Sequence, residues 1–186
     1  LEFTATPKST SNIIYAYDVA RGAAEGYLKI PVVTGRSNTA GYSQEDIEEM
    51  KIRDGLTLHE HRKAVLREYC SENDLDYVKP IVLIACKDTD HAEWVERYIK
   101  SDDFKDGSYK DKVIKVHSKL KGAESEENLC NLLAVEQADN IIEIVIHVNM
   151  LKEGWDVNNL YTIVPLRTAA SKILREQMIG RGLRLP

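Results

Sequence analysis

The sequence predicts an α/β fold in which a parallel β-sheet is flanked by helices on both faces. Two observations predict it. Short and almost continuously apolar runs alternate along the chain with longer segments whose apolar residues recur at helical spacing. Within the short runs apolar residues do not alternate with polar ones, which is the pattern of strands buried on both faces of a parallel sheet.

The most regular part of this pattern begins at residue 79. Thr89 or Asp90 is expected to cap its first helix and Ser125 its second, because a side-chain oxygen there can accept an unpaired backbone N–H. The expected order is strand, helix, strand, helix, strand, strand and helix, in the segments KPIVLIAC (79–86), DTDHAEWVERYIK (88–100), KVIKVH (112–117), ESEENLCNLLAVEQ (124–137), NIIEIVIHV (140–148), NLYTIVPL (159–166) and SKILREQMIGRGL (171–183).

The first part of the chain is less regular. NIIYAYDV (12–19) is typical of a strand, a polar stretch rich in Gly, Ser and Asn covers 35–43, and TLHEHRKAVLREYC (57–70) is typical of a helix. We expect an insertion or accessory subdomain here. His59 and His61 are two residues apart and so point away from each other on a helix, which predicts solvated side chains and no metal site.

The composition indicates a globular protein of 186 residues, 43% of them apolar, with a formal net charge of −5. No apolar run approaches the roughly 20 residues of a membrane span, and no signal-peptide pattern opens the chain, so we expect a cytoplasmic protein without a membrane partner. The three cysteines form no CxxC pair, which argues against a zinc site or a disulfide framework. The opening LEFTATP already resembles part of a strand, so we expect a piece of a longer protein.

A cluster of polar groups closes the sequence. In SKILREQMIGRGLRLP, the residues Gln177, Gly180, Arg181 and Arg184 share one helical face. Two guanidinium groups beside an amide and a glycine suit the phosphates of a nucleotide, because arginine offers planar and permanently charged pairs of donors. The alternative is a solvated helix face on which arginines near the C-terminus interact favourably with the helix dipole.

A second polar segment lies between two of the predicted strands. Gly154 and Asp156 follow the strand that ends near Val148, so they fall at the carboxyl edge of the sheet, where open α/β sheets bind ligands. The alternative for Asp156 is an ordinary turn residue, and the alternative for Gly154 is a backbone position with positive φ.

Several segments resemble a known family. Q-x-x-G-R-x-x-R and the preceding G-x-D-V resemble motifs VI and V of superfamily 2 helicases, and FTATP resembles their motif III. LEFTATP, KPIVLIACKDTDHAEWV, MLKEGWDV and SKILREQMIGRGLRLP are similar to the restriction (Res) subunit of type III restriction enzymes. The resemblance covers residues 1–7 and 79–186. It implies motif III and an interdomain linker at 1–11, a less regular part at 12–78, and a second RecA-like domain, the helicase C-terminal core, at 79–186.

The resemblance implies roles in ATP hydrolysis. In the family, ATP and Mg²⁺ lie between two RecA-like domains, of which the first supplies the Walker A loop and DExH box and the second supplies arginine fingers. By the match to motif VI, Arg184 is expected to be the finger and Arg181 to assist it at the γ-phosphate. Gln177 would contact the nucleotide or orient the finger. Asp156 would bind the ribose hydroxyl, and Gly154 would let the backbone approach the nucleotide.

The resemblance also implies contact with double-stranded DNA. Lys87, Asn149 and Lys152 are expected to hold backbone phosphates without base preference. Motif V in the broader family often has a threonine before its glycine, where this chain has Asn149 preceded by valine. Thr4 and Thr6 match motif III and are expected to couple the ATP state to domain movement, although such a pair can also be structural.

Other motifs of a complete motor are absent from the sequence. It contains no G-x-x-x-x-G-K-[ST] and no convincing nuclease motif, and DTDH (88–91) is typical of a helix start, not of a DExH box. The chain alone is therefore expected to be inactive. The parent would be a bacterial or archaeal restriction endonuclease whose modification (methyltransferase) subunit is its partner. Two alternatives stay open: another superfamily 2 motor, such as a type I restriction motor or a DEAD-box RNA helicase, and a non-catalytic α/β domain that binds a partner through residues 35–54.

Overall fold

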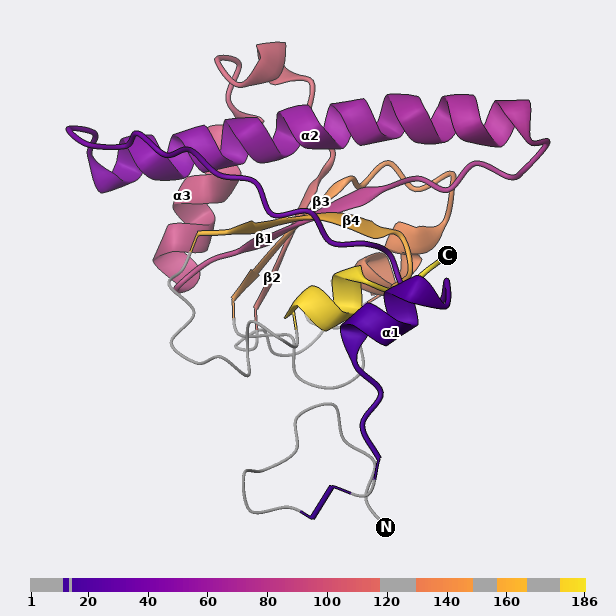
Figure 1. The fold of residues 1–186 in the computed structure, drawn as a ribbon. Coiled ribbons are helices and arrows are strands. Elements are labelled where there is room, and N and C mark those ends of the chain that lie inside the picture. The colour runs from indigo at the N-terminus through magenta and orange to yellow at the C-terminus, as the bar shows by residue number, and fades with distance from the viewer. Residues whose placement is uncertain (1–11, 14, 118–129, 149–156, 167–177) are drawn as a thin grey trace.

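The computed structural model describes residues 12–13, 15–117, 130–148, 157–166 and 178–186. Four parallel strands form one sheet in the order β2-β3-β1-β4, with helices on both faces (Figure 1). The predicted α/β fold with a parallel sheet is confirmed, and it is consistent with a RecA-like fold. The elements are α1 (Val19–Ala24), α2 (Gln44–Glu72), β1 (Ile81–Ala85), α3 (Thr89–Lys100), β2 (Val113–His117), β3 (Ile144–Val148) and β4 (Leu160–Pro165), with short 3-10 helices at Lys105–Gly107 and Ala134–Glu136.

The two central strands, β1 and β3, are buried along their whole length. Successive side chains of a strand point to opposite faces of its sheet. Val82 and Ile84 of β1 therefore join the core on one face, whereas Ile81 and Leu83 join the core on the other face. Because both faces are covered, neither strand needs polar residues at alternate positions, which explains the continuous apolar sequence of β1 and the presence of a single polar residue, His147, in β3.

The strand order requires helices on both faces. The chain crosses from β1 to β2 in one direction, whereas the connections from β2 to β3 and from β3 to β4 run the other way. Since connections between parallel strands are right-handed, the connection from β1 to β2 must lie on the opposite face from the connection from β2 to β3. α3 accordingly packs with α2 on one face, and Val135 and Met178, which belong to later parts of the chain, pack on the other.

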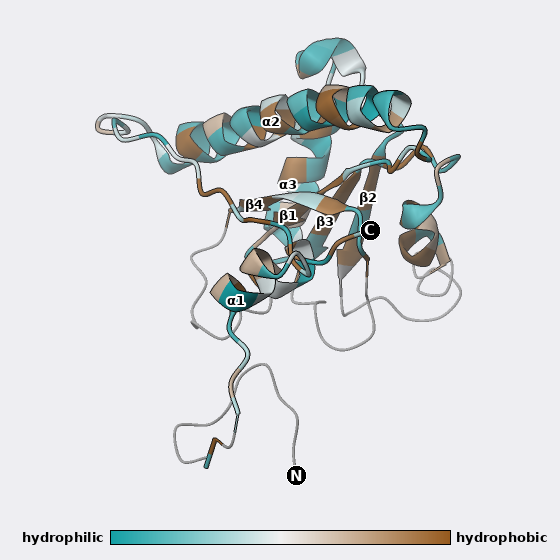
Figure 2. Cartoon of the chain, turned by 45° about the vertical axis from the view of Figure 1, so that its right-hand side comes forward, coloured by the Kyte–Doolittle hydropathy of each residue, from teal (hydrophilic) through white to brown (hydrophobic). Residues whose placement is uncertain are grey.

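α2 is longer than the sequence predicts. The expected helix at 57–70 lies inside it, but α2 begins at Gln44, directly after the polar stretch 35–43. Ser43 and Asp46 form a capping box, in which each side chain accepts the backbone N–H of the other residue. Figure 2 shows many hydrophilic residues along α2, and no helix in the described ranges is long and apolar enough to cross a membrane.

The buried face of α2 carries polar residues. Ile52, Leu56, His59 and Lys63 recur at intervals of three or four residues and are all buried. His59 is fully buried, so the prediction of a solvated side chain was wrong for this residue, whereas His61 is exposed as predicted. Spacing between the two histidines shows that they point apart, but only the packing of α2 on the sheet decides which of them is buried.

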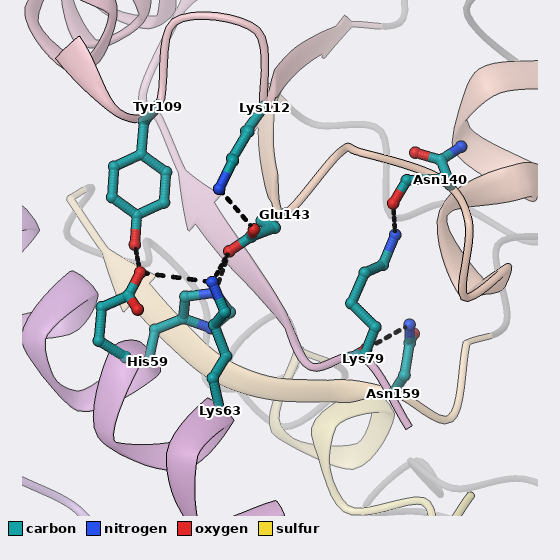
Figure 3. Close-up of polar contacts among 9 residues, drawn as sticks. His59, Lys63, Lys79, Tyr109, Lys112, Asn140, Glu143 and Asn159 are labelled. Carbon is teal, nitrogen blue, oxygen red and sulfur yellow. Dashed lines mark hydrogen bonds and ion pairs between the residues drawn. The ribbon is translucent and has the colours of Figure 1, made fainter. Parts of the chain in front are cut away.

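Glu143, which directly precedes β3, joins α2 to the sheet (Figure 3). Its Oε2 accepts a hydrogen bond from Lys63 Nζ at 2.7 Å and lies 3.0 Å from His59 Nε2. Its Oε1 accepts a hydrogen bond from Lys112 Nζ at 2.9 Å. Burial raises the pKa of the Glu143 carboxyl group, but the hydrogen bonds from these three side chains outweigh burial and hold the pKa well below its usual range.

The described part of residues 12–19 does not form the predicted strand. α1 starts at the end of this segment, and the Asp18 side chain caps it by accepting the Arg21 backbone N–H at 2.7 Å. Tyr15 and Tyr17 are exposed. The capping carboxylate therefore decided the local structure here, and the alternating aromatic residues did not.

We expect Glu143→Gln to lower the free energy of unfolding by about 3 to 5 kcal/mol at pH 7, because Lys63 would keep a buried charge with only the more distant and half-exposed carboxylate of Glu60, 3.6 Å away, as its partner. Since the pKa of Glu143 in the folded chain lies below the ordinary value of 4.5, its stabilisation is present above about pH 4.5 and is lost as the pH falls further. Urea unfolding of both proteins between pH 7 and pH 3 should therefore show the difference shrinking.

Asp102→Asn is the matched control for this prediction. Asp102 pairs with Lys110 on the surface, and its side chain is 85% exposed. Exposed pairs contribute little to stability, so this variant should leave the urea midpoint nearly unchanged. Equal losses for the two variants would contradict a stabilising role of the buried Glu143 charge.

Candidate functional site

The turn that follows β1 lies at the carboxyl edge of the sheet and carries an exposed lysine, Lys87. The turn leads directly into α3. The N-cap of α3 is Asp88, whose Oδ1 accepts the His91 backbone N–H at 2.8 Å. The predicted helix start is therefore confirmed, but the cap lies one or two residues before Thr89 and Asp90. One carboxylate thus fixes the backbone immediately after Lys87.

His91 holds the same turn from the protein interior. Its side chain is buried, and its Nδ1 accepts the Lys87 backbone N–H at 3.3 Å. Because Nδ1 is the acceptor, the proton of the neutral ring lies on Nε2. This Nε2 is 3.1 Å from Glu48 Oε2 of α2, a close contact without the geometry of a regular hydrogen bond. α2 therefore supports the conformation of the turn that presents Lys87.

The C-terminal motif begins on a short helix that packs against β4, and Arg184 lies beyond the end of this helix. The prediction that Arg184 shares a helical face with Arg181 was therefore wrong, because the chain leaves the helix to form a bridge with Leu28. Residues 178–182 are helical. Gly182 approaches Ile163 closely, since a Cβ on this glycine would lie 3.1 Å from the isoleucine Cδ1. Arg181 is half-buried and Arg184 is exposed. One side of this helix therefore packs on the sheet while both arginine side chains remain at or near the surface.

The structure does not bring Lys87 and Arg184 together. Lys87 follows the carboxyl end of β1. Arg184 forms an isolated antiparallel bridge with Leu28, and the neighbouring Lys29 donates a hydrogen bond to the Leu160 carbonyl at the amino end of β4. In a parallel sheet these two ends lie at opposite edges, and Figure 1 shows the C-terminal segment beside α1. The two predicted contacts thus occupy separate regions of the domain.

Seven predicted site residues lie outside the described residues. Four of them lie in segment 149–156, which follows β3. Ala85 at the end of β1 pairs with His147 near the end of β3, so the two strands end at the same edge of the sheet. The chain therefore enters segment 149–156 at the carboxyl edge of the sheet, as predicted. The seven residues are Gln177, Gly154 and Asp156 for the nucleotide, Asn149 and Lys152 for DNA, and Thr4 and Thr6 for coupling.

The contact between residues 28–29 and the C-terminal segment was not predicted. Lys29 donates its backbone N–H to the Leu183 carbonyl at 2.7 Å. The local sequence around Lys29 has no pattern that would indicate this partner. A contact between two distant parts of the chain has no signature in either part taken alone.

Three possible metal ligands gather at the buried face of α2. One atom each of His59, Glu60 and Glu143 lies within 4.8 Å of the others. However, Lys63 and Lys112 already donate hydrogen bonds to the two oxygens of Glu143. Their ammonium groups would repel a divalent cation, so this cluster is suited to a structural charge network and not to a metal ion.

A groove of about 720 Å³ runs beside β2, between α3 and residues 139–142. None of the residues predicted for the site lines it. Glu96 pairs with Lys100 at 2.8 Å and with Lys115 at 2.9 Å, so these three charged groups of the groove are bound to one another.

No family model matches the chain. The chain is 30% identical over 149 residues to the type III restriction-modification enzyme EcoPI Res subunit of Escherichia phage P1, and the match covers 76% of this chain and 14% of that protein. It is 50% identical over 36 residues to the type III restriction-modification enzyme StyLTI Res subunit of Salmonella typhimurium, which is 19% of this chain and 4% of that protein. The predicted similarity to Res subunits is confirmed, and the chain spans about a seventh of the length of the first relative.

We expect His91→Ala to lower the free energy of unfolding by about 1 to 3 kcal/mol, because the Lys87 backbone N–H would lose its acceptor. His91→Asn should recover part of this loss, since its side-chain oxygen can take the place of Nδ1. Urea unfolding of the 186-residue chain measures both effects, with Glu93→Ala at an exposed position of α3 as the control. Equal losses for the alanine and asparagine variants would show that the bond to Lys87 contributes nothing.

Proposed function

We propose that the chain is the second RecA-like motor domain of a type III restriction Res subunit, an ATP-driven DNA translocase. The observation that carries the proposal is the similarity to the EcoPI Res subunit over most of this chain. The all-parallel sheet with the order β2-β3-β1-β4 supports a RecA-like domain as the part concerned. The domain would work opposite a first RecA-like domain of the same polypeptide, which would bind ATP and Mg²⁺.

In this proposal the C-terminal segment supplies the arginine fingers. Arg184 would reach the γ-phosphate of ATP held by the other domain, and Arg181 would assist it. Negative charge develops on the transferring phosphoryl group, and a positioned guanidinium group that neutralises it is worth about 10³ to 10⁵ in rate. The exposure of Arg184 supports this role, because its backbone is held by a bridge to Leu28 and follows a helix that packs on β4, while the residue remains accessible.

Other nucleotide contacts would come from the residues that match motifs V and VI. Gln177 would hydrogen-bond the nucleotide or orient the finger, and Asp156 would accept a hydrogen bond from the ribose. Gly154 would allow the backbone to come close to the nucleotide. Thr4 and Thr6 would transmit the ATP state between the two domains.

The carboxyl edge of the sheet would hold the DNA backbone. Lys87 is exposed on a turn that the Asp88 cap and the His91 ring both hold in place. A lysine on a fixed turn suits a phosphate group, because the cost of ordering the backbone of the turn is already met by the fold. Asn149 and Lys152, in the segment after β3, would add further contacts. Such contacts have no base preference, so recognition of a DNA sequence would fall to the modification subunit.

A second candidate is a non-catalytic interaction domain, and one observation favours it. Ile30, Val32 and Val33 are 78%, 80% and 94% exposed, an unusual run of exposed apolar side chains. A partner could cover them. An interaction domain would not need Arg184 for ATP hydrolysis, whereas the proposed motor domain would. A third candidate is another superfamily 2 motor, which would differ from a Res subunit in having no nuclease motif elsewhere in the parent protein.

The motor proposal predicts that Arg184→Ala in the full-length parent lowers the kcat of DNA-stimulated ATP hydrolysis by about 10³ to 10⁵. Nucleotide affinity should be largely kept, since the first domain would hold ATP. Arg184→Lys should also be strongly impaired, because a lysine lacks the planar donor pair. Arg97→Ala, which removes an exposed arginine from α3, is the control. Normal turnover by the Arg184→Ala protein, with folding checked by circular dichroism, would rule out the finger and favour an interaction domain.

A separate prediction concerns Lys87. Lys87→Ala in the full-length parent should weaken DNA binding to a similar degree for any sequence. It should also reduce the slope of log affinity against log salt concentration by about 0.9, the value for one lost phosphate contact. Fluorescence anisotropy at several salt concentrations measures both quantities, with Lys51→Ala on the exposed side of α2 as the control. An unchanged slope would mean that Lys87 does not touch the DNA backbone.

A further inference from the structure

The segment that contains Leu28 and Lys29 is paired with the residues around Arg184. Leu28 and Arg184 form an antiparallel bridge, and the Lys29 backbone N–H donates to the Leu183 carbonyl at 2.7 Å. Leu183 itself is buried, and its backbone N–H donates to the Ile179 carbonyl at 3.2 Å. The backbone next to Arg184 is therefore held by hydrogen bonds to the preceding helix and to residues 28–29.

The side chain of Lys29 ties this pairing to the sheet. Its ammonium group donates hydrogen bonds to the carbonyl oxygens of Asn158, at 2.5 Å, and Leu160, at 3.1 Å, where β4 begins. The same group lies 4.1 Å from the centre of the Tyr161 ring, within the range of a cation–π contact. Burial lowers the pKa of Lys29 to about 8, so at pH 7 the group is charged and partly desolvated. Lys29 thus connects the C-terminal segment to β4 through both its backbone and its side chain.

α1 packs against the segment that pairs with the C-terminal residues. Gly22 of α1 is buried, and a Cβ at this position would lie 2.7 Å from Leu28 Cδ1. The Tyr27 backbone N–H also donates to the Gly22 carbonyl at 2.9 Å. A side chain at position 22 would therefore displace the end of the Leu28 side chain.

We propose that Lys29 is a positioning residue for Arg184: by bonding Leu183 and the start of β4 at once, it fixes the C-terminal arginine segment against the sheet. This inference rests on the proposed function of Arg184 as an arginine finger. A finger must meet the γ-phosphate within a narrow range of positions, and a displacement of about 1 Å can cost about 10²-fold in rate. The less regular N-terminal part of the chain would therefore serve catalysis by supporting the finger.

The test uses the full-length parent and separates positioning from folding. Lys29→Met keeps the aliphatic stem and removes the ammonium group, and it should lower the kcat of ATP hydrolysis by about 10- to 100-fold. The KM for ATP and the affinity for DNA should stay within about twofold, because neither site is touched by Lys29. Lys29→Arg, which keeps the charge and the donors, should restore most of the kcat. A general loss of folding would instead impair binding and turnover together.

The double variant Lys29→Met with Arg184→Ala gives the decisive comparison. If Lys29 acts through Arg184, this protein should be no slower than Arg184→Ala alone, whereas independent effects would multiply. Two results would overturn the positioning role of Lys29 without contradicting the role of Arg184. One is that the two losses of kcat multiply in the double variant, and the other is that Lys29→Met has a normal kcat although Arg184→Ala has lost its activity. A normal kcat for Arg184→Ala would instead overturn the proposed function itself.

Gly22→Ala supplies a second variant in case Lys29→Met fails to fold. It displaces Leu28 without altering Lys29 or the arginine, and it should lower kcat less than Lys29→Met while leaving both binding constants unchanged. An unchanged kcat for Gly22→Ala, with a normal circular dichroism spectrum, would count against the proposed support.

Discussion

The buried carboxylate of Glu143 is the interaction on which the arrangement of α2 depends. α2 lays His59 and Lys63 against the sheet, and these side chains are buried at little cost only where a fixed negative charge meets them. The position of α2 then decides where its first turns lie, and there Glu48 contacts His91 of α3. A charge at the amino end of β3 thus contributes, through two helices, to the conformation of the turn at the opposite edge.

The order of the strands separates the two regions proposed for function. Lys87 follows the carboxyl end of β1, whereas the segment around Arg184 is held near the amino end of β4. Between them lies a sheet whose central strands are fully buried. Close packing makes such a sheet stiff. In the proposed motor, a displacement of the domain driven at the nucleotide would therefore reach the DNA contact with little loss.

The N-terminal part of the chain gains a role from this arrangement. Residues 28–29 lie outside the segments that resemble the family. They nevertheless pair with the residues around Arg184 and contact the start of β4. The proposed coupling residues Thr4 and Thr6 belong to the same stretch of chain. In the proposed motor, the part of the chain that follows Thr4 and Thr6 in sequence would thus include the residues that support the arginine segment.

The sequence alone determined the parallel sheet, its central strands and the start of α3, because buried strands and helix caps are encoded by neighbouring residues in the chain. It also supplied the similarity to Res subunits, through short segments that each carry their own pattern. The burial of His59, the full length of α2 and the pairing of Lys29 with Leu183 were decided only by the tertiary structure. Each of these depends on a partner far away in the sequence, and periodicity or capping within one segment carries no information about which distant segment will meet it.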